Sequence, residues 1–412
     1  MKNFIGYKKS ILFGIGFLFF MVDLKAQEPA SARQLFQQGQ LEKAKESVDS
    51  FVLHYSNNEE GWLLKASIYN AITKDQNFKD LVADGRMDAY QALQKAVALN
   101  KTYVEAELKP AGYSLAFDLY NGYTDEGVTY FNAGAERNDK GSYAEALSKF
   151  KKAGTIGQFI YHNNWGLTAT DTSNVYYSAR AAINAGKDED AFVFAKRITD
   201  GGITKTATQK GFEPVYQWLA FYYKQQQDEA NLVKYTQLGM KNFPASTYFN
   251  LILIDWLRQQ KDYTGLFANY QEVFKKQPNN SSYQLAYCND IFNYLYANKP
   301  APPNRALYQG KLSAGLLQYI KTNPATVDGR LLLGKFYINQ ANDAAKINKA
   351  KEKSLLQQSN KYLTEIINKF PGTDKLVYKE ALQLAVANYR RLNMMKEAKR
   401  YEGLLWGAFF TK

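Results

Sequence analysis

The chain has 412 residues, of which 46% are hydrophobic and 15% aromatic, and its formal net charge is +13. This apolar content excludes a disordered chain, and 27 glycines with 10 prolines are too few for a low-complexity protein. The length allows two or three globular domains or one elongated array of repeats.

The first 26 residues differ from the rest and predict a secretory signal peptide. Lys2, Lys8 and Lys9 precede an apolar run over residues 11–22, and Ala26 is a small residue suited to cleavage. The run is short for a bilayer span, which takes about 20 residues, but an uncleaved anchor is the alternative. We expect residues 27–412 to be exported, periplasmic or secreted, and soluble, without stable membrane insertion.

The basic charge and the single cysteine narrow the classes of partner and of fold. Removing residues 1–26 takes away four lysines and one aspartate, so the rest stays basic. An export signal and scattered lysines argue against nucleic acid as a partner. A solvated surface is the expectation, with weak attraction to anionic envelope components as the alternative. Cys288 excludes an internal disulfide, and no cysteine follows the apolar run to carry a lipid.

The stretch 126–154, "EGVTYFNAGAERNDKGSYAEALSKFKKAG", predicts two helices joined by a short turn. Tyr130, Ala133, Gly134 and Arg137 share one face by their spacing, as do Tyr143, Ala146, Leu147, Phe150 and Ala153. Gly141 is suited to end the first helix and Ser142 to cap the second. Such helices pack antiparallel, and we expect Gly134 and Ala146 at their contact.

This pattern resembles a tetratricopeptide repeat, a helix pair of about 34 residues, and it recurs along the chain. "GQLEKA" at 39–44 and "GKDEDA" at 186–191 repeat the turn, while Pro244 and Pro278 lie at expected repeat boundaries. The resemblance implies an all-α solenoid of about nine antiparallel helix pairs over residues 27–412. The best-matching stretches lie near 27–101, 127–160, 172–206, 213–280, 327–372 and 379–412.

Four segments depart from the repeat. Residues 103–126 fit poorly and predict an extra helical element with Pro110 near a helix start. Residues 155–174 predict an insertion, with His162 in a long loop. "YANKPAPPNRA" predicts a loop, and "NQANDAAKINKAKEKSLLQQ" predicts lengthened helices because it lacks proline and glycine.

No catalytic or metal-binding constellation is apparent, and we predict neither enzymatic activity nor a cofactor. The two histidines, His54 and His162, lack metal-ligand spacing. Cys288 occupies the small-residue position that Ala220 and Gly334 hold in other repeats, which predicts a buried structural thiol. The acidic run 188–190 lies at a repeat turn, where a solvated surface explains it.

The resemblance implies that the first helices of successive repeats line a concave groove for a peptide or a partner helix. The candidate residues mix basic, amide and aromatic side chains: Tyr176, Arg180, Asn184, Gln217, Phe221, Lys224, Arg258, Lys335 and Asn339. Each of these could equally be part of an ordinary helix face that binds nothing.

Two functions follow from this sequence. The first is an exported, non-enzymatic scaffold that binds a protein or peptide partner in envelope complex assembly. The alternative is a glycan- or nutrient-binding helical-repeat protein, which a Trp and Tyr platform on the segment 161–174 would favour. That segment is also the next candidate site if the first helices bind no partner.

Overall fold

The computed structural model describes residues 29–167, 171–205, 211–297, 302–371 and 374–409. Over these ranges the chain is helical, and its only β-type pairing is an isolated bridge between Lys205 and Gly211. The signal peptide predicted for residues 1–26 lies outside the described residues. None of the described helices has the length and apolar character needed to cross a membrane.

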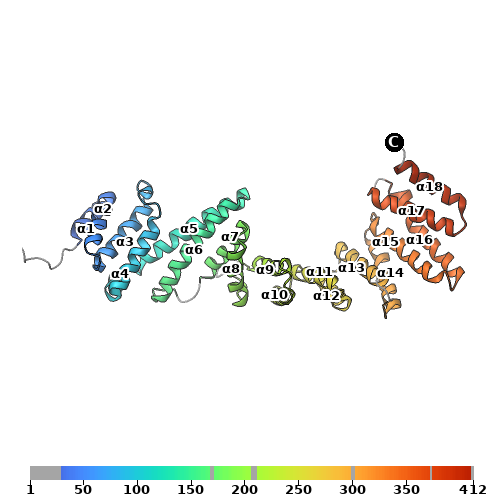
Figure 1. Ribbon diagram of the computed structural model, residues 1–412, viewed down its shortest axis with the longest axis horizontal. Helices are drawn as coiled ribbons and strands as arrows, with labels where there is room; N and C mark the ends of the chain where they lie inside the picture. The colour runs from blue at the N-terminus through green and yellow to red at the C-terminus, as the bar shows by residue number, and fades with distance from the viewer. Residues whose placement is uncertain (1–28, 168–170, 206–210, 298–301, 372–373, 410–412) are drawn as a thin grey trace, which may run out of the picture. The chain divides into compact units, whose positions relative to one another are not determined.

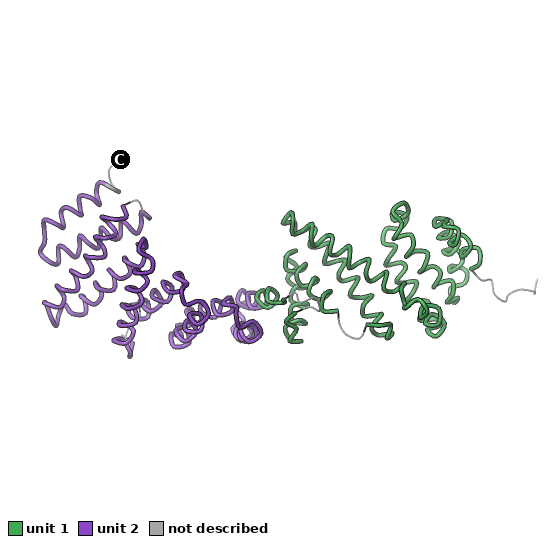
Figure 2. Tube along the Cα trace, turned by 180° about the vertical axis from the view of Figure 1, so that it is seen from behind, with its two compact units in different colours: residues 1–219 green, residues 220–412 purple. Residues whose placement is uncertain are grey.

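The chain divides into two compact units, residues 1–219 and 220–412 (Figure 2). The first unit contains α1 Ala30–Gln37, α2 Leu41–His54, α3 Glu59–Lys74, α4 Gly85–Leu108, α5 Ser114–Arg137, α6 Lys140–His162, α7 Thr172–Ala185 and α8 Asp188–Asp200, with short 3-10 turns at Lys79–Leu81 and Lys109–Ala111 (Figure 1). Helix α9, Glu213–Gln225, contains the boundary. The second unit continues with α10 Glu229–Asn242, α11 Tyr248–Gln260, α12 Tyr263–Lys276, α13 Ser281–Tyr296, α14 Arg305–Thr322, α15 Asp328–Ala344, α16 Lys349–Lys369, α17 Lys375–Arg391 and α18 Met395–Phe409.

Within each unit the helices form stacked antiparallel pairs. Neighbouring helices along the chain pack on each other, for example α5 on α6 and α15 on α16. The first helix of a pair also contacts the first helix of the next, as α3 contacts α5 and α15 contacts α17. Among the described residues eight consecutive pairs pack in this way: α1–α2, α3–α4, α5–α6, α7–α8, α11–α12, α13–α14, α15–α16 and α17–α18. Helices α9 and α10 follow one another along the chain between the fourth and fifth of these. This confirms the predicted all-α, solenoid-type architecture of tetratricopeptide-like pairs.

The turns within pairs follow the sequence signals closely where glycine supplies the left-handed backbone conformation. Gly39 (φ 74°) lies between α1 and α2, and Gly186 (φ 69°) ends α7. Both turns were predicted at these residues. Pro244 and Pro278 lie between pairs, after α10 and after α12, because proline cannot continue the preceding helix. These boundaries are confirmed.

The turn between α5 and α6 was predicted at the wrong residues. Asn138 adopts the left-handed conformation (φ 50°) that ends α5, and the Asp139 carboxylate caps α6 by accepting from the Gly141 and Ser142 amides. Asparagine tolerates this backbone conformation, and aspartate is a strong N-cap. These two residues therefore place the turn before Gly141, and Gly141 and Ser142 lie inside α6.

Residues 103–126 are helical, as predicted. They include the end of α4, which follows a break in the helix at Asn100 (φ −155°, ψ 86°), and the first half of α5. Pro110 lies at the start of the 3-10 turn between them, also as predicted. The segment 155–162 was predicted to be part of an insertion, and here the prediction is wrong. Helix α6 continues through residues 155–162 because Ile156 and Ile160 are fully buried against the core. His162 therefore ends a helix and does not lie in a loop.

The other two departures agree with the prediction where the structure describes them. Helices α15 and α16 are long, 17 and 21 residues, and are separated by a turn over residues 345–348. The proline-rich segment separates α13 from α14, and its residues 298–301 lie outside the described ranges.

The small residues of the opening repeat pack as predicted, although with different partners. Ala146 and Ala153 are fully buried, and Ala146 belongs to an apolar cluster with Ala181 and Ala182 of α7. Gly134 is buried too, but it faces Tyr143: a Cβ at this position would lie 3.0 Å from the Tyr143 ring. Gly134 thus makes room for an aromatic ring, and Ala146 for the next helix pair.

Replacing Ala146 with leucine should destabilise the first unit. A larger side chain at this fully buried position overpacks the cluster it shares with α7, which typically costs about 1–3 kcal/mol. Thermal denaturation followed by circular dichroism measures the effect. Ala135→Leu, on an exposed position of α5, is the control and should change the melting temperature little. Equal shifts in the two variants would contradict this assignment of the packed face.

Candidate functional site

The first-helix candidates in the first unit lie on α7 and at the start of α9. Tyr176 is only 9% exposed, and its ring packs edge-on against Phe212 with ring centroids 5.0 Å apart. Arg180 donates from Nη1 to the Tyr176 hydroxyl at 3.3 Å. Asn184 is half-buried one turn further along α7, and Gln217 bonds to Glu213 on its own helix. Tyr176 therefore contributes mainly to packing, whereas Arg180 and Asn184 reach the surface.

The candidates on α9 and α11 in the second unit lie within a chain of ion pairs. Lys224 contacts Asp255 at 2.9 Å, and Asp255 also contacts Arg258 at 2.9 Å. Arg258 donates from Nε and Nη2 to the two carboxylate oxygens of Asp290, at 2.8 and 2.9 Å. These hydrogen bonds to Asp290 raise the pKa of Arg258 above its ordinary value, against the effect of burial. The positive charges of Lys224 and Arg258 are thus largely balanced by neighbouring carboxylates.

Phe221 and the two candidates on α15 complete the set. Phe221 is 43% exposed, which is high for a phenylalanine. Lys335 forms an ion pair with Glu380 of α17 at 2.5 Å, and Asn339 donates to the Lys335 carbonyl at 3.0 Å. Sequence reasoning missed the acidic partners Asp255, Asp290 and Glu380. A signal existed for two of them, because Asp255 and Asp290 follow their basic partners by 31 and 32 residues, close to one repeat. Glu380 follows Lys335 by 45 residues, across the lengthened helices.

Cys288 is a buried structural thiol, as predicted. It is 1% exposed on α13, and burial raises its pKa to about 12. A Cβ added at Gly315 would lie 3.0 Å from its sulfur, so α14 packs closely on this side chain. At ordinary pH the group stays a thiol, which is a poor nucleophile and a poor metal ligand.

The remaining titratable groups considered in the sequence do not converge. His54 and His162 are both exposed and end different helices, α2 and α6. The acids of residues 188–190 lie in the first turn of α8, where Asp190 pairs with Lys151 at 2.5 Å. Among the described residues no group of three or more His, Cys, Asp or Glu side chains could hold a metal ion.

Trp165 does not form the ring platform that would have favoured a glycan ligand. It is 1% exposed, stacks on Tyr113 with ring centroids 5.0 Å apart, and donates from Nε1 to Glu105 at 3.1 Å. One ring face and the polar edge therefore make contacts inside the protein, and little of the ring is left to stack on a sugar. Tyr161 nearby is 45% exposed.

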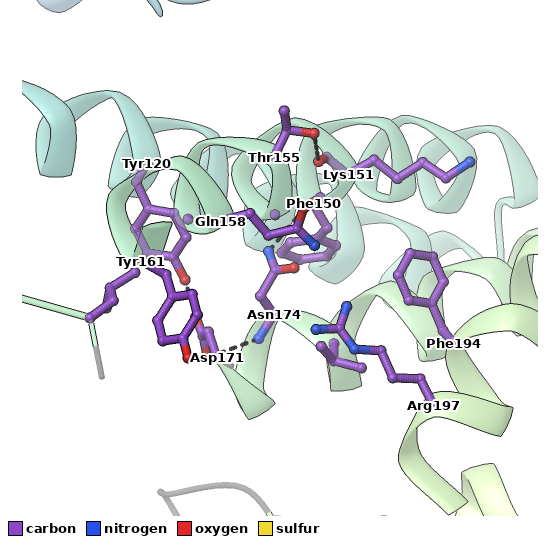
Figure 3. Close-up of a pocket in the computed structure, with 14 residues that line it drawn as sticks. Tyr120, Phe150, Lys151, Thr155, Gln158, Tyr161, Asp171, Asn174, Phe194 and Arg197 are labelled. Atoms are coloured by element: carbon purple, nitrogen blue, oxygen red, sulfur yellow. Dashed lines mark hydrogen bonds between the residues drawn. The ribbon is translucent and has the colours of Figure 1, made fainter. Parts of the chain in front are cut away.

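A cavity of about 350 Å³ opens beside Tyr161, between helices α5, α6, α7 and α8 of the first unit (Figure 3). Its lining residues come mainly from α6, from the start of α7 and from α8: Tyr120, Phe150, Lys151, Gly154, Thr155, Gly157, Gln158, Tyr161, Leu167, Asp171, Asn174, Val175, Phe194 and Arg197. It includes part of the segment 161–174, and none of the nine first-helix candidates lines it.

Comparison with known proteins adds little to this description. No family model and no curated protein matches the chain. Among solved structures, the P58(IPK) TPR domain is similar at 15% identity over 92% of this chain and 91% of that one, with a TM-score of 0.26. The human IFIT1 dimer with PPP-AAAA is similar at 11% identity over 94% and 92%, with a TM-score of 0.25. Scores this low carry no argument about fold or ligand.

The fold assignment therefore rests on the chain's own helix pairs, their short turns and the contacts between successive first helices. On these grounds the described chain is an all-α repeat protein built from tetratricopeptide-like helix pairs.

Proposed function

We propose that this chain is an exported, non-enzymatic scaffold that binds a protein or peptide partner along its first helices and serves in envelope complex assembly. Stacked helix pairs of this kind present extended surfaces suited to partner binding. The basic, apolar segment at the N-terminus supports export. The proposal includes no cofactor and no nucleic acid.

The observation that carries the proposal is the exposure of Phe221 on a first helix. An aromatic ring 43% exposed on the helix that also carries Gln217 and Lys224 has the chemistry of an interface anchor. On α7, Arg180 has a tyrosine hydroxyl as its polar contact and no carboxylate partner among the residues that the structure describes. It can therefore pair with an acidic group of a partner at less cost than Lys224 or Arg258, which already contact acids.

The double variant Arg180→Gln, Phe221→Ala should weaken partner binding at least tenfold. The first change removes the cation and the second removes an apolar anchor. Proteins captured from an envelope fraction by the wild-type chain are identified by mass spectrometry, and the affinity of each purified partner is then measured. Affinity for the wild type should fall as salt rises, because Arg180 is partly exposed.

The matched control is Arg137→Gln, Val193→Ala, which changes two exposed side chains on α5 and α8. It should bind every captured partner like the wild type. If the double variant also binds all of them with unchanged affinity, the first helices are not the binding surface and the proposal is wrong.

A further inference from the structure

The cavity beside Tyr161 has the size and the lining of a small-molecule site. Its volume of about 350 Å³ falls at the lower end of the range for ligand pockets, about 300–1,000 Å³. Aromatic and aliphatic side chains alternate with a few polar groups along its walls, which is typical of such sites. The cavity lies wholly within the first unit.

The inner wall is held in place by bonds within the protein. Asp171 caps α7 by accepting from the Ser173 and Asn174 amides, and it also accepts from the Tyr120 hydroxyl. Gly157 lets Tyr120 lie close to α6: a Cβ there would lie 3.1 Å from the ring. These contacts fix the wall before a ligand arrives, which lowers the entropic cost of binding.

Asn174 provides a polar side chain at the wall of the cavity. The side chain lines the cavity and is only 7% exposed, and its Nδ2 donates to the Phe150 carbonyl at 3.1 Å. That bond fixes the amide orientation, with Oδ1 near Gly154 of α6, which also lines the cavity: a Cβ there would lie 3.2 Å from this oxygen. An acceptor held in this way is available to a donor group on a ligand.

Two basic side chains line the cavity, Lys151 and Arg197. The Lys151 ammonium group contacts Asp190 at 2.5 Å. Figure 3 shows Arg197 and Phe194 reaching from α8 toward Asn174, with Tyr120 and Tyr161 on the other side near Asp171. A guanidinium group has five N–H donors and binds a carboxylate in a two-pronged geometry, so it can serve a ligand as well as the protein.

We propose that this cavity binds a small carboxylic acid with an aromatic or apolar body. The carboxylate pairs with Arg197, and the body lies between Phe194, Val175 and the Tyr161 ring. A donor group on the ligand, such as a hydroxyl, bonds to Asn174 Oδ1. This site is separate from the first-helix surface, so either one could exist without the other.

Binding of phenylacetate to the full chain, measured by titration calorimetry, tests the proposal. We expect half-saturation at or below about 1 mM, as is usual for a ligand of this size. Phenylacetamide, which has the same shape without the charge, should bind at least tenfold more weakly. Arg197→Gln should abolish the difference between the two compounds, whereas Arg137→Gln, on an exposed position of α5, should preserve it.

A second variant tests whether phenylacetate binds in this cavity, and it leaves Arg197 unchanged. Thr155 is exposed and lines the cavity, and its hydroxyl bonds to the carbonyl four residues earlier. Thr155→Trp should fill the cavity and weaken phenylacetate binding at least tenfold. Thr129→Trp is the matched control, since Thr129 is exposed with the same type of bond but lies outside this cavity.

Three outcomes would overturn the proposal. The first is no binding of phenylacetate at about 10 mM, well above the expected range. The second is equal binding of acid and amide to the wild type. The third is binding of a capped aspartyl-phenylalanine dipeptide without binding of phenylacetate, because the cavity would then serve a protein segment and not a free acid.

Discussion

Phe249→Ala should lower the free energy of unfolding of the second unit by about 3–5 kcal/mol, the usual cost of removing a buried phenylalanine ring. Phe249 is fully buried on α11, and its ring lies against Gly239 of α10, where an added Cβ would come within 2.2 Å of it. The substitution leaves a cavity between two helices that pack on each other. Chemical denaturation followed by circular dichroism gives the value.

The loss should spread beyond α10 and α11, because each helix pair depends on its neighbours for stability. Amide hydrogen exchange would show faster opening in α12 and α13 as well. Phe221→Ala is the control: that ring is 43% exposed, and its loss should cost less than about 1 kcal/mol. Similar losses in both variants would mean that Phe249 is not the packing residue described above.

Asp290→Ala should have the second largest effect, about 2–3 kcal/mol of unfolding free energy. The Asp290 carboxylate is buried and accepts from Arg258 Nε and Nη2 and, at 2.7 Å, from the Tyr270 hydroxyl. Its removal leaves these donors without their acceptor. The effect stays below that of a fully buried pair because the Arg258 side chain is 41% exposed and water can solvate it.

The free energy of unfolding of the Asp290→Asn variant should lie between those of the alanine variant and the wild type, because an amide oxygen still accepts one hydrogen bond. Glu272→Ala is the control for an exposed pair: Lys275 and Glu272 are 70% and 49% exposed, and the change should stay within about 0.5 kcal/mol. A loss from Glu272→Ala as large as that from Asp290→Ala would assign the effect to net charge and contradict the role of the buried carboxylate.

The parts of the fold that local chemistry determines could be predicted from the sequence. Gly39 and Gly186 mark turns because glycine adopts the left-handed conformation at little cost. The lengthened helices α15 and α16 follow from a segment without proline or glycine. The turn at Asn138 was missed because asparagine and aspartate there compete with the nearby Gly141 for the same role.

Long-range contacts could not be predicted in this way. Trp165 lies among polar residues in the sequence, and its burial depends on Tyr113 and Glu105, which are far away along the chain. The cavity beside Tyr161 likewise needs α8 to face the end of α6. The first-helix site remains a prediction. Acidic residues pair with the basic residues of this site and lower its net charge. In the sequence, only an alignment of successive repeats would have revealed these acidic partners.

The ion pairs between successive first helices share a direction along the chain. In each pair the base is on the earlier helix and the acid on the later one: Lys74 with Asp118, Lys224 with Asp255, Arg258 with Asp290, and Lys335 with Glu380. On the first-helix face, each of these later helices thus offers an acid to a base of the helix pair before it, whereas pairs elsewhere, such as Asp49 with Lys65 and Glu352 with Arg391, run the other way. A helix pair docked on the wrong face of its neighbour would bring like charges together, and this disfavours misassembly during folding, the characteristic failure of repeat proteins.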